Sequence, residues 1–188
     1  MYKNIILFII LIYFILLSLQ SIRYYIWYPT ITDYPNNASE IKIMVRDYIN
    51  KRTPENIAFF KLTDKSPIKA FQNIISDEQM QKIHKIITSP AIILKIMYYK
   101  KLYNRARPSQ IAPHLINALY STTANTPSYP SGHAIQAYYA AKILSKWEPS
   151  RKKELLEIAR RCADIRIIAG LHYPSDRDFG MWLVDNKL

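Results

Sequence analysis

The stretch Ser128-Tyr-Pro-Ser-Gly-His133 joins a polar loop to an amphipathic segment, and the rest of the chain is best understood from it. Pro130 restricts its own backbone and Gly132 relaxes its own, so the chain can turn sharply here. After the turn, apolar residues recur at steps of three and four, which places them on one face of a helix: Ala137, Ala140, Leu144 and Trp147. His133 begins this face, so its ring is expected to point into the protein.

The start of this helix is a candidate anion site. The backbone N–H groups of Ser131, Gly132 and His133 lie at the expected N-terminus, where the helix dipole favours negative charge. The missing Cβ at the glycine lets an anion come close. Taken alone, the same pattern also fits an ordinary helix start with a buried core histidine, so the remaining chain has to decide between them.

Composition points to a folded protein with an acidic partner. The 188 residues suffice for one domain with a sizeable core, and 49% hydrophobic residues argue against disorder. A formal net charge of +12 suits phosphate esters, anionic lipids or nucleic acid. The single cysteine, Cys162, excludes an internal disulfide and a cysteine-based zinc site, and the sequence contains no Gly-rich nucleotide-binding motif.

Residues 5–19 form an apolar run that only Tyr13 and Ser18 interrupt, and an aromatic cluster follows at 24–28. A spanning helix needs about 20 apolar residues, and aromatic side chains settle at membrane interfaces. We therefore expect residues 1–28 to be an uncleaved membrane anchor; a cleaved signal peptide or a buried helix would also fit. Lys3 and the terminal amine mildly favour a single-pass topology with the domain extracytoplasmic, or a secreted or periplasmic domain if the segment is cleaved.

Residues 29–188 are expected to form one helical domain. Ser76-Asp-Glu-Gln79 fits a capping box, and three hydroxyl–proline pairs are typical of helix starts: Thr53-Pro54, Ser66-Pro67 and Ser89-Pro90. The sequence shows no convincing strand pattern, and no uncharged apolar run after residue 28 reaches spanning length. The predicted fold is all-α, a compact helical bundle preceded by one N-terminal hydrophobic helix.

A long helix predicted from Ser150 to about Gly170 places Arg166 on its apolar face. Burying an unpaired charge is costly, so Arg166 requires an anionic partner. His172-Tyr-Pro-Ser-Asp176 follows, and its proline can start a last helix from which Asp176 reaches back to His172. Such a carboxylate fixes the tautomer of an imidazole and leaves the other ring nitrogen able to attack. A turn with an aspartate cap is the alternative interpretation.

Three segments occur together with a known order and spacing: Lys100-x6-Arg107-Pro108, Pro130-Ser-Gly-His133 and Arg166-x5-His172-x3-Asp176. In these segments the chain resembles the type 2 phosphatidic acid phosphatase superfamily, which includes class A acid phosphatases, lipid phosphate phosphatases and vanadium haloperoxidases. It looks most like the class A acid phosphatases. Ile165 stands where the family usually has Ser, which puts the rate in doubt, and Arg177 stands where a small apolar residue is common.

This resemblance implies a metal-independent hydrolase of small-molecule or lipid phosphoesters that needs no cofactor. His172 would be the nucleophile, Asp176 would orient it, and a protonated His133 would protonate the leaving oxygen and later activate water. The resemblance assigns the phosphate oxygens to five residues: Lys100, Arg107, Ser131, Gly132 and Arg166. A pH profile that peaks on the acidic side and inhibition by vanadate are expected.

Three other functions remain open on the sequence. The anchor and the positive charge also suit a membrane-associated lipid phosphate or isoprenyl pyrophosphate phosphatase. A vanadium haloperoxidase would use the same residues, with vanadate on His172 as its cofactor. A basic, membrane-tethered binding protein for nucleic acid or acidic lipid would explain the charge but not the spacing of the three segments, so no nucleic-acid partner is expected.

Overall fold

The computed structural model describes residues 5–6, 8, 11–12 and 31–188. The anchor or signal segment predicted for residues 1–28 therefore lies largely outside the described residues. Within them, all regular structure is helical, which confirms the all-α prediction. None of the helices in this described part is both long enough and apolar enough to cross a membrane.

The helices of the domain are α2 (Asn37–Asp47), α3 (Pro54–Thr63), α4 (Asp77–Ile87), α5 (Pro90–Tyr103), α6 (Pro108–Ile111), α7 (Gly132–Trp147), α8 (Lys152–Ile168) and α9 (Pro174–Lys187). Short 3-10 turns lie between some of them, namely η1 (Ile49–Lys51), η2 (Pro67–Phe71) and η3 (Pro149–Arg151).

Local sequence explains several helix starts. Thr53 accepts a hydrogen bond from the Asn56 N–H, and Ser76 with Gln79 forms the predicted capping box. The start of α8 differs from the prediction, because Ser150 was expected to cap this helix, whereas its N-cap is Arg151 and the helix begins at Lys152. The proline at 149 favours the tighter turn η3 before the α-helix begins.

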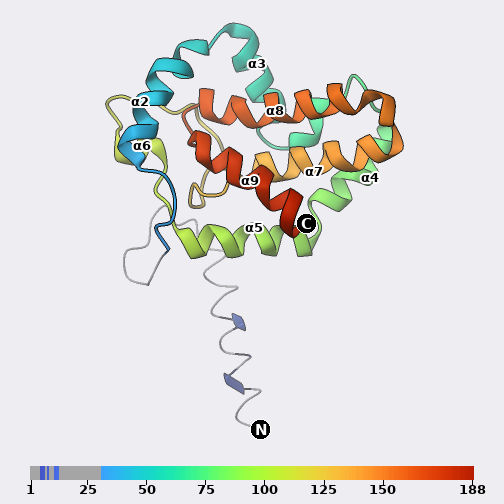
Figure 1. Ribbon diagram of the computed structural model, residues 1–188, viewed down its shortest axis with the longest axis horizontal. Helices are drawn as coiled ribbons and strands as arrows, with labels where there is room; N and C mark the ends of the chain where they lie inside the picture. Colours follow the sequence, from blue (N-terminus) through green and yellow to red (C-terminus); the bar gives the residue numbers. More distant parts are fainter. Residues whose placement is uncertain (1–4, 7, 9–10, 13–30) are drawn as a thin grey trace.

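Helices α7 and α8 form the centre of the bundle and run antiparallel (Figure 1). Their contact is rich in small side chains, which allow the two backbones to approach closely. The residues that α7 and α8 bury against one another are Ala137, Ala140, Ala141, Leu144, Leu155, Ala159 and Cys162. Isoleucines of α4 and side chains of η2 complete this core.

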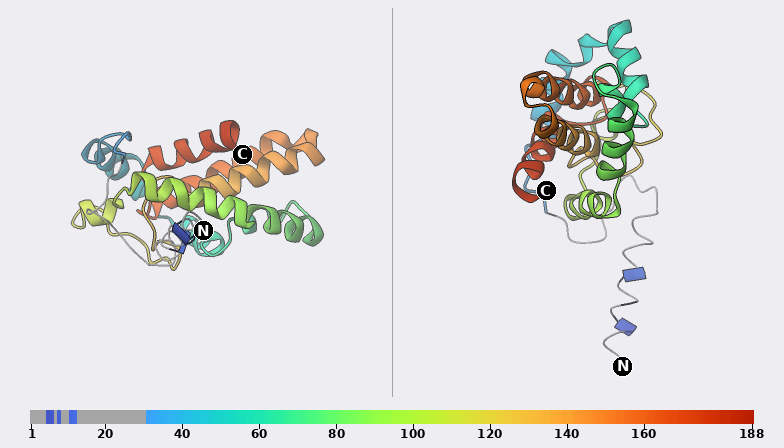
Figure 2. Two further views of the ribbon diagram at one scale, coloured as in Figure 1. Left: turned by 90° about the horizontal axis from the view of Figure 1, so that it is seen from below. Right: turned by 90° about the vertical axis from the view of Figure 1, so that its right-hand side faces the viewer.

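Helix α5 lies at one edge of the bundle, below α7 and α9 in Figure 1 and at the bottom of the right-hand view in Figure 2. Its inner face packs with α7 and α9 through Ile92 and Ile96. Its outer face leaves apolar side chains in solvent, with Leu94 64% and Tyr98 57% exposed. The N–H of Ile31 donates to the carbonyl of Leu102 at 3.0 Å, so the chain enters the domain beside the end of α5.

The helix ends that carry the three sequence segments meet at one end of the bundle, on the left in Figure 1. These are the C-terminal ends of α5 and α8 and the N-terminal ends of α6, α7 and α9. After α8, Gly170 adopts a φ of 78°, and the Leu171 N–H donates to the Arg166 carbonyl at 3.0 Å. This turn carries the chain directly from Arg166 to His172.

Candidate active site

The first turn of α9 holds His172 and Asp176 together. Pro174 starts the helix, and the Asp176 carboxylate reaches back, with Oδ2 3.0 Å from His172 Nδ1. The same oxygen accepts hydrogen bonds from the Tyr173 N–H at 2.9 Å and from the Ser128 hydroxyl. Both His172 and Asp176 are buried, so the structure brings this pair together as the sequence predicted.

Arg107 approaches the other nitrogen of the His172 ring. Its Nη1 donates to the Leu171 carbonyl at 2.7 Å and lies 3.3 Å from His172 Nε2. Because a guanidinium can only donate, Nε2 must be the acceptor, and the ring proton is then on Nδ1, facing Asp176. Burial, followed by the charges of Arg107 and Lys100, holds the pKa of His172 well below its ordinary value. Nε2 therefore carries a lone pair.

Lys100, Arg107 and Arg166 gather around this ring with few counter-charges. Lys100 donates to the Pro127 carbonyl, and burial with the neighbouring charge of Arg107 holds its pKa well below the usual value. Burial and the charge of Arg166 lower the pKa of Arg107 to about 10. The Nε of Arg166 is buried without a hydrogen-bond partner among the described residues. An anion placed here would satisfy this donor and relieve the repulsion among the three cations.

Asp64 is the anionic partner that Arg166 requires, and sequence reasoning missed it. Arg166 Nη1 donates to Asp64 Oδ1 at 2.6 Å, while Nη2 donates to the hydroxyls of Ser121 and Thr123. Burial alone would raise the pKa of Asp64, but hydrogen bonds from Ser121 and Arg166 outweigh it, so this pKa is lowered. The one signal for this partner is the charge of Arg166 on an apolar helix face, which does not indicate where along the chain the partner lies.

His133 begins α7 with its ring buried, as predicted, but its protonation differs from the expectation. Its Nε2 lies 2.8 Å from the Asp64 carbonyl, which only accepts, so Nε2 carries a proton and Nδ1 is left to exchange one. Burial and the charge of Arg166 lower the pKa of His133 to about 3, so the ring is neutral near pH 6 rather than protonated. Negative charge beside Nδ1 would act in the opposite direction and favour the imidazolium.

Ser131 and Gly132 occupy the helix start that the sequence predicted. Ser131 is the N-cap of α7, and its hydroxyl accepts from the Ala134 N–H at 3.4 Å. The sequence predicted that the Ser131 N–H would face an anion. Instead this N–H donates to the backbone carbonyl of Asp176 at 2.9 Å, so it is not available to an anion. The N–H groups of Gly132 and His133 belong to the first turn of α7, which provides no carbonyl four residues back.

A cavity of about 220 Å³ opens beside Arg107. Leu119, Tyr120, Ser121 and Leu171 are among the residues that line it. Tyr120 is 87% exposed, which places it at the mouth of the cavity. Because Arg107 and Ser121 also belong to the cluster of cations and hydroxyls described above, the cavity leads directly into this cluster.

Arg105 is a second residue of the site that sequence reasoning missed. It is fully buried, and its Nη1 donates to Asp176 Oδ1 at 2.8 Å. It lies between Lys100 and Arg107, inside the spacer of the first segment, where the signature prescribes no residue type. Within the described ranges, no three His, Cys, Asp or Glu side chains gather in a way that could hold a metal ion.

The sequence of this chain matches the family model of the PAP2 superfamily over residues 85–183, a range that contains all three segments. The chain belongs to this superfamily. The membership expected from the spacing of Lys100, Arg107, His133, Arg166, His172 and Asp176 is thereby confirmed.

Curated relatives match the same region. The chain is 34% identical over 86 residues to a non-specific acid phosphatase of Salmonella typhimurium, covering 45% of this chain and 34% of the relative. It is 30% identical over 123 residues to a non-specific acid phosphatase of Providencia stuartii, covering 58% of this chain and 46% of the relative. The matched regions thus span less than half the length of these relatives.

Two solved structures share the fold. Aquifex aeolicus LpxE superposes with a TM-score of 0.58 at 24% identity, covering 83% of this chain and 94% of that chain. A transmembrane PAP2-type phosphatidylglycerolphosphate phosphatase of Bacillus subtilis superposes with a TM-score of 0.51 at 18% identity, covering 98% of this chain and 91% of the other. At these identities the likeness establishes the fold alone.

Proposed function

We propose that the protein is a phosphatase that hydrolyses phosphomonoesters through a phosphohistidine formed on His172. One observation carries this proposal: an imidazole with an unprotonated Nε2 is fixed by Asp176 and surrounded by three buried cations. This combination suits a nucleophile that attacks a phosphorus atom bearing several negative oxygens. The likeness to non-specific acid phosphatases supports the same reaction.

In the first step, Nε2 of His172 forms a bond to phosphorus while the bond from phosphorus to the leaving oxygen breaks. Lys100, Arg107 and Arg166 stabilise the phosphate oxygens, and the Arg107 contact with Nε2 opens so that this guanidinium turns to the phosphate. His133 Nδ1 gives a proton to the leaving oxygen. In the second step, neutral His133 takes a proton from water, which attacks phosphorus and releases phosphate from His172.

The protonation of His133 couples this mechanism to substrate binding. The ring is neutral in the protein alone, because its pKa is about 3. A phosphomonoester loses its second proton with a pKa of about 6, so its monoanion can bring the required proton into the site. Once bound, its negative charge favours that proton on His133. The active complex therefore forms best in acidic solution.

The cavity beside Arg107 favours a compact leaving group. A volume of about 220 Å³ lies below the roughly 300–1,000 Å³ usual for pockets of drug-sized ligands. Leu119, Tyr120 and Leu171 offer apolar contacts to such an alcohol. We accordingly place small phosphomonoesters first among the substrates.

A lipid phosphate or isoprenyl pyrophosphate is the second candidate, because a separate observation favours a membrane. The outer face of α5 exposes Ile93, Leu94 and Tyr98, and Lys95 and Lys101 flank it on the same helix. The described residues of the N-terminal apolar run are exposed as well, and they lie on the α5 side of the domain (Figures 1 and 2).

We propose that residues 1–28 hold the protein as a single-pass anchor, with the domain extracytoplasmic and the α5 face resting on the lipid surface. Exposed apolar side chains beside lysines suit an interface with anionic headgroups. A domain freed by cleavage of this segment is the alternative.

The direct test is hydrolysis of p-nitrophenyl phosphate by the full chain in detergent, with EDTA present. Wild-type protein should turn over, and His172→Ala should lose nearly all activity. His84→Ala provides a matched control, because His84 is exposed on α4 and lies outside the three segments. Vanadate, which resembles the five-coordinate transition state, should inhibit.

Other outcomes of this assay separate the alternatives. Turnover confined to lipid phosphates in mixed micelles would make the lipid class the substrate. Bromide oxidation by peroxide with added vanadate, without phosphatase activity, would identify a haloperoxidase. Activity that survives His172→Ala would contradict the proposal.

A further inference from the structure

Arg105 is held by every one of its N–H donors, although it lies outside the three signature positions. Nε donates to Asn37 Oδ1 at 2.9 Å. Nη1 donates to Ser175 Oγ at 2.7 Å and to Asp176 Oδ1 at 2.8 Å. Nη2 donates to the Pro35 carbonyl at 3.1 Å and to Glu40 Oε2 at 2.6 Å. Five donors with five partners match the full capacity of a guanidinium.

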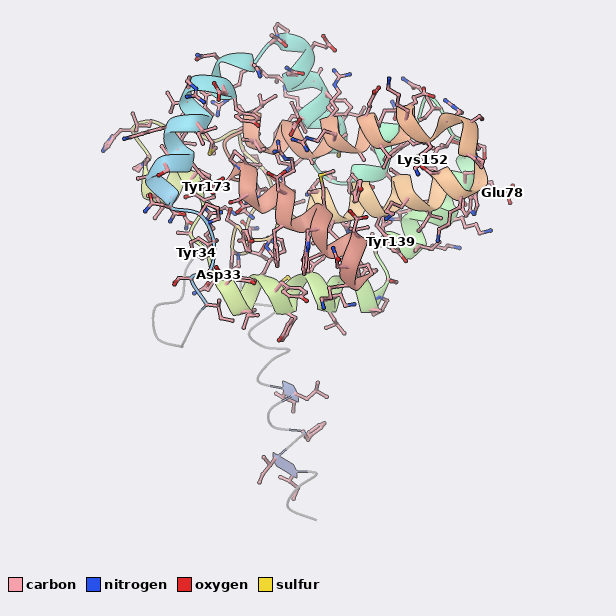
Figure 3. All side chains as sticks on the ribbon, in the orientation of Figure 1. Asp33, Tyr34, Glu78, Tyr139, Lys152 and Tyr173 are labelled. Carbon is pink, nitrogen blue, oxygen red and sulfur yellow. The ribbon has the colours of Figure 1, made fainter. Side chains whose placement is uncertain are left out.

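Three aromatic rings surround the guanidinium of Arg105, and those of Tyr173 and Tyr34 lie nearer to it than the ring of Tyr129, whose centroid is 5.7 Å away. The central carbon of the guanidinium lies 3.7 Å from the centroid of the Tyr173 ring and 4.6 Å from that of Tyr34. Figure 3 labels both tyrosines on the side of the domain where α2 begins. Stacking of this kind restricts the rotation of a planar cation and adds cation–π attraction.

A continuous line of alternating charges leads from α2 to the His172 ring. Glu40 pairs with Arg105, Arg105 pairs with Asp176 Oδ1, and Asp176 uses its other oxygen for His172 Nδ1. Glu40 also accepts from the Ser175 N–H at 2.8 Å, which ties α2 to the first turn of α9. The Asp176 carboxylate is thus held at both oxygens, and its plane cannot rotate away from His172.

We propose that Arg105, itself held by Glu40, is a positioning residue that fixes the Asp176 carboxylate and thereby the reactive orientation of His172. This inference rests on the proposed function. A purely structural role would be met more cheaply by apolar side chains of similar volume, because burying two carboxylates and a guanidinium carries a large desolvation cost. This buried charge network is justified if the reaction depends on the position of the Asp176 carboxylate.

The positive charge of Arg105 also limits how strongly Asp176 attracts a proton to His172. Without that charge, Asp176 would act on His172 as a less compensated anion and raise its pKa, so protonation would remove the nucleophile at a higher pH. The other charged or titratable groups facing His172 come from α5, the residue that precedes α6, α7 and α8, and they are unchanged by the substitution: Lys100, Arg107, His133 and Arg166.

The test compares Arg105→Gln, Arg105→Lys and Glu40→Gln with wild type in the full chain. Residues that orient the histidine ligands of metal sites contribute about 10–100-fold to activity, and we take the same factor for a residue that orients His172 through Asp176. We expect Arg105→Gln to lower kcat by about this factor with little change in KM, and to move the acidic limb of kcat to higher pH. Arg105→Lys should restore the position of that limb but only part of kcat. Glu40→Gln should lower kcat less than Arg105→Gln does. The double variant that combines Arg105→Gln and Glu40→Gln should have a kcat no lower than that of Arg105→Gln alone.

Arg52→Gln is the matched control, because the Arg52 guanidinium donates to two backbone carbonyls, those of Ile168 and Asn117, rather than to a carboxylate of the site. It should leave the pH limb in place. Nitrogen-15 NMR of the His172 ring adds a readout that needs no turnover. Wild type should show the Nδ1–H tautomer, and Arg105→Gln a mixture or the other tautomer.

Several results would overturn the inference. One is an unchanged tautomer with an unshifted pH limb in Arg105→Gln. Another is a loss of activity that equals the loss of folded protein in both Arg105→Gln and Arg52→Gln. If Arg105→Gln fails to fold, Arg105→Lys and Glu40→Gln decide by the same measurements. Absence of turnover in wild type with the Nδ1–H tautomer intact would count against the proposed function and leave the positioning role standing.

Discussion

Two groups act on opposite nitrogens of the His172 ring. Asp176 accepts a hydrogen bond from the Nδ1–H group, and Arg107 donates a hydrogen bond toward Nε2. Each contact alone favours the same tautomer, so the Nε2 lone pair that we propose as the nucleophile is in place before any substrate binds. His133 and His172 stay neutral among the cations because burial disfavours the charged form of a histidine.

The pH profile follows from the pKa of the buried His172 and from that of the substrate phosphate. The pKa of His172 is held well below 6.5, so this ring stays neutral as the pH falls through 6. On the basic side, the substrate monoanion disappears above a pKa of about 6. We expect kcat/KM to be level from well below pH 6 up to about pH 6 and to fall at higher pH. A rate that rises steadily to pH 9 would contradict this account.

Ile165 replaces the serine usual in the family, and its side chain is only 2% exposed in a cluster with Phe60 and Leu171. A serine there would place a hydroxyl among apolar groups. We expect Ile165→Ser to lower the free energy of unfolding by about 2–4 kcal/mol with little effect on kcat. Denaturant unfolding measures the change in the free energy of unfolding, and steady-state kinetics measures the change in kcat. The control Ile165→Val should lower the free energy of unfolding by only about 1 kcal/mol. A several-fold rise in kcat would show that the serine hydroxyl reaches the phosphate.

Helix α5 serves the site and the surface with opposite faces. Its last turn buries Lys100 toward the other cations, whereas Leu94 and Tyr98 point outward. Apolar side chains that gather on an exposed helix face mark an interaction site. The described chain resumes at Ile31, whose N–H donates to the Leu102 carbonyl at the end of this helix. These features support the proposed contact of the α5 face with a lipid surface.

A fluorescent label on Leu94→Cys tests this placement in vesicles that contain anionic lipid. A lipid-borne quencher should quench a label at position 94 strongly and a label on Lys153→Cys weakly, since the Lys153 side chain is 91% exposed on α8. Cys162 should not react, because it is buried and burial raises the pKa of its thiol to about 12. Equal quenching at both positions, or efficient cross-linking between two copies through position 94, would contradict the membrane contact.

The elements were predictable where the signal is local. Capping residues such as Ser76 and Thr53 predict where their helices start, and Pro174 predicts the start of α9, because each acts on the few residues that follow it. The exact start of α8 was not predictable, because the 3-10 turn η3 competes with the α-helix over its first turn.

At the scale of the whole molecule, the site was predictable only in part. His172 and Asp176 are four residues apart, so a helix start brings them together. Asp64 lies 102 residues from Arg166, and Glu40 lies 65 residues from Arg105. Such pairings depend on how α2, α3, α8 and the segment after α5 pack, and no local pattern encodes that. The resemblance supplied the signature positions and was silent on their partners.

The same packing brings helix ends that are far apart in sequence to a single place, where they gather His172, His133 and three cationic side chains. The central claim is that phosphorus becomes bonded to His172. Trapping that intermediate tests it most directly, and His133→Asn should help, because it removes the group that activates water for the second step.

The measurement is rapid acid-free quenching of a p-nitrophenyl phosphate reaction by the full chain, followed by peptide mass spectrometry. We predict one phosphoryl group on the peptide that contains His172, stable in alkali and lost in acid, and more abundant in His133→Asn than in wild type. No phosphoryl group should form in His172→Ala. Turnover without any phosphoenzyme, or phosphoryl transfer to Ser131 or another side chain, would contradict the account.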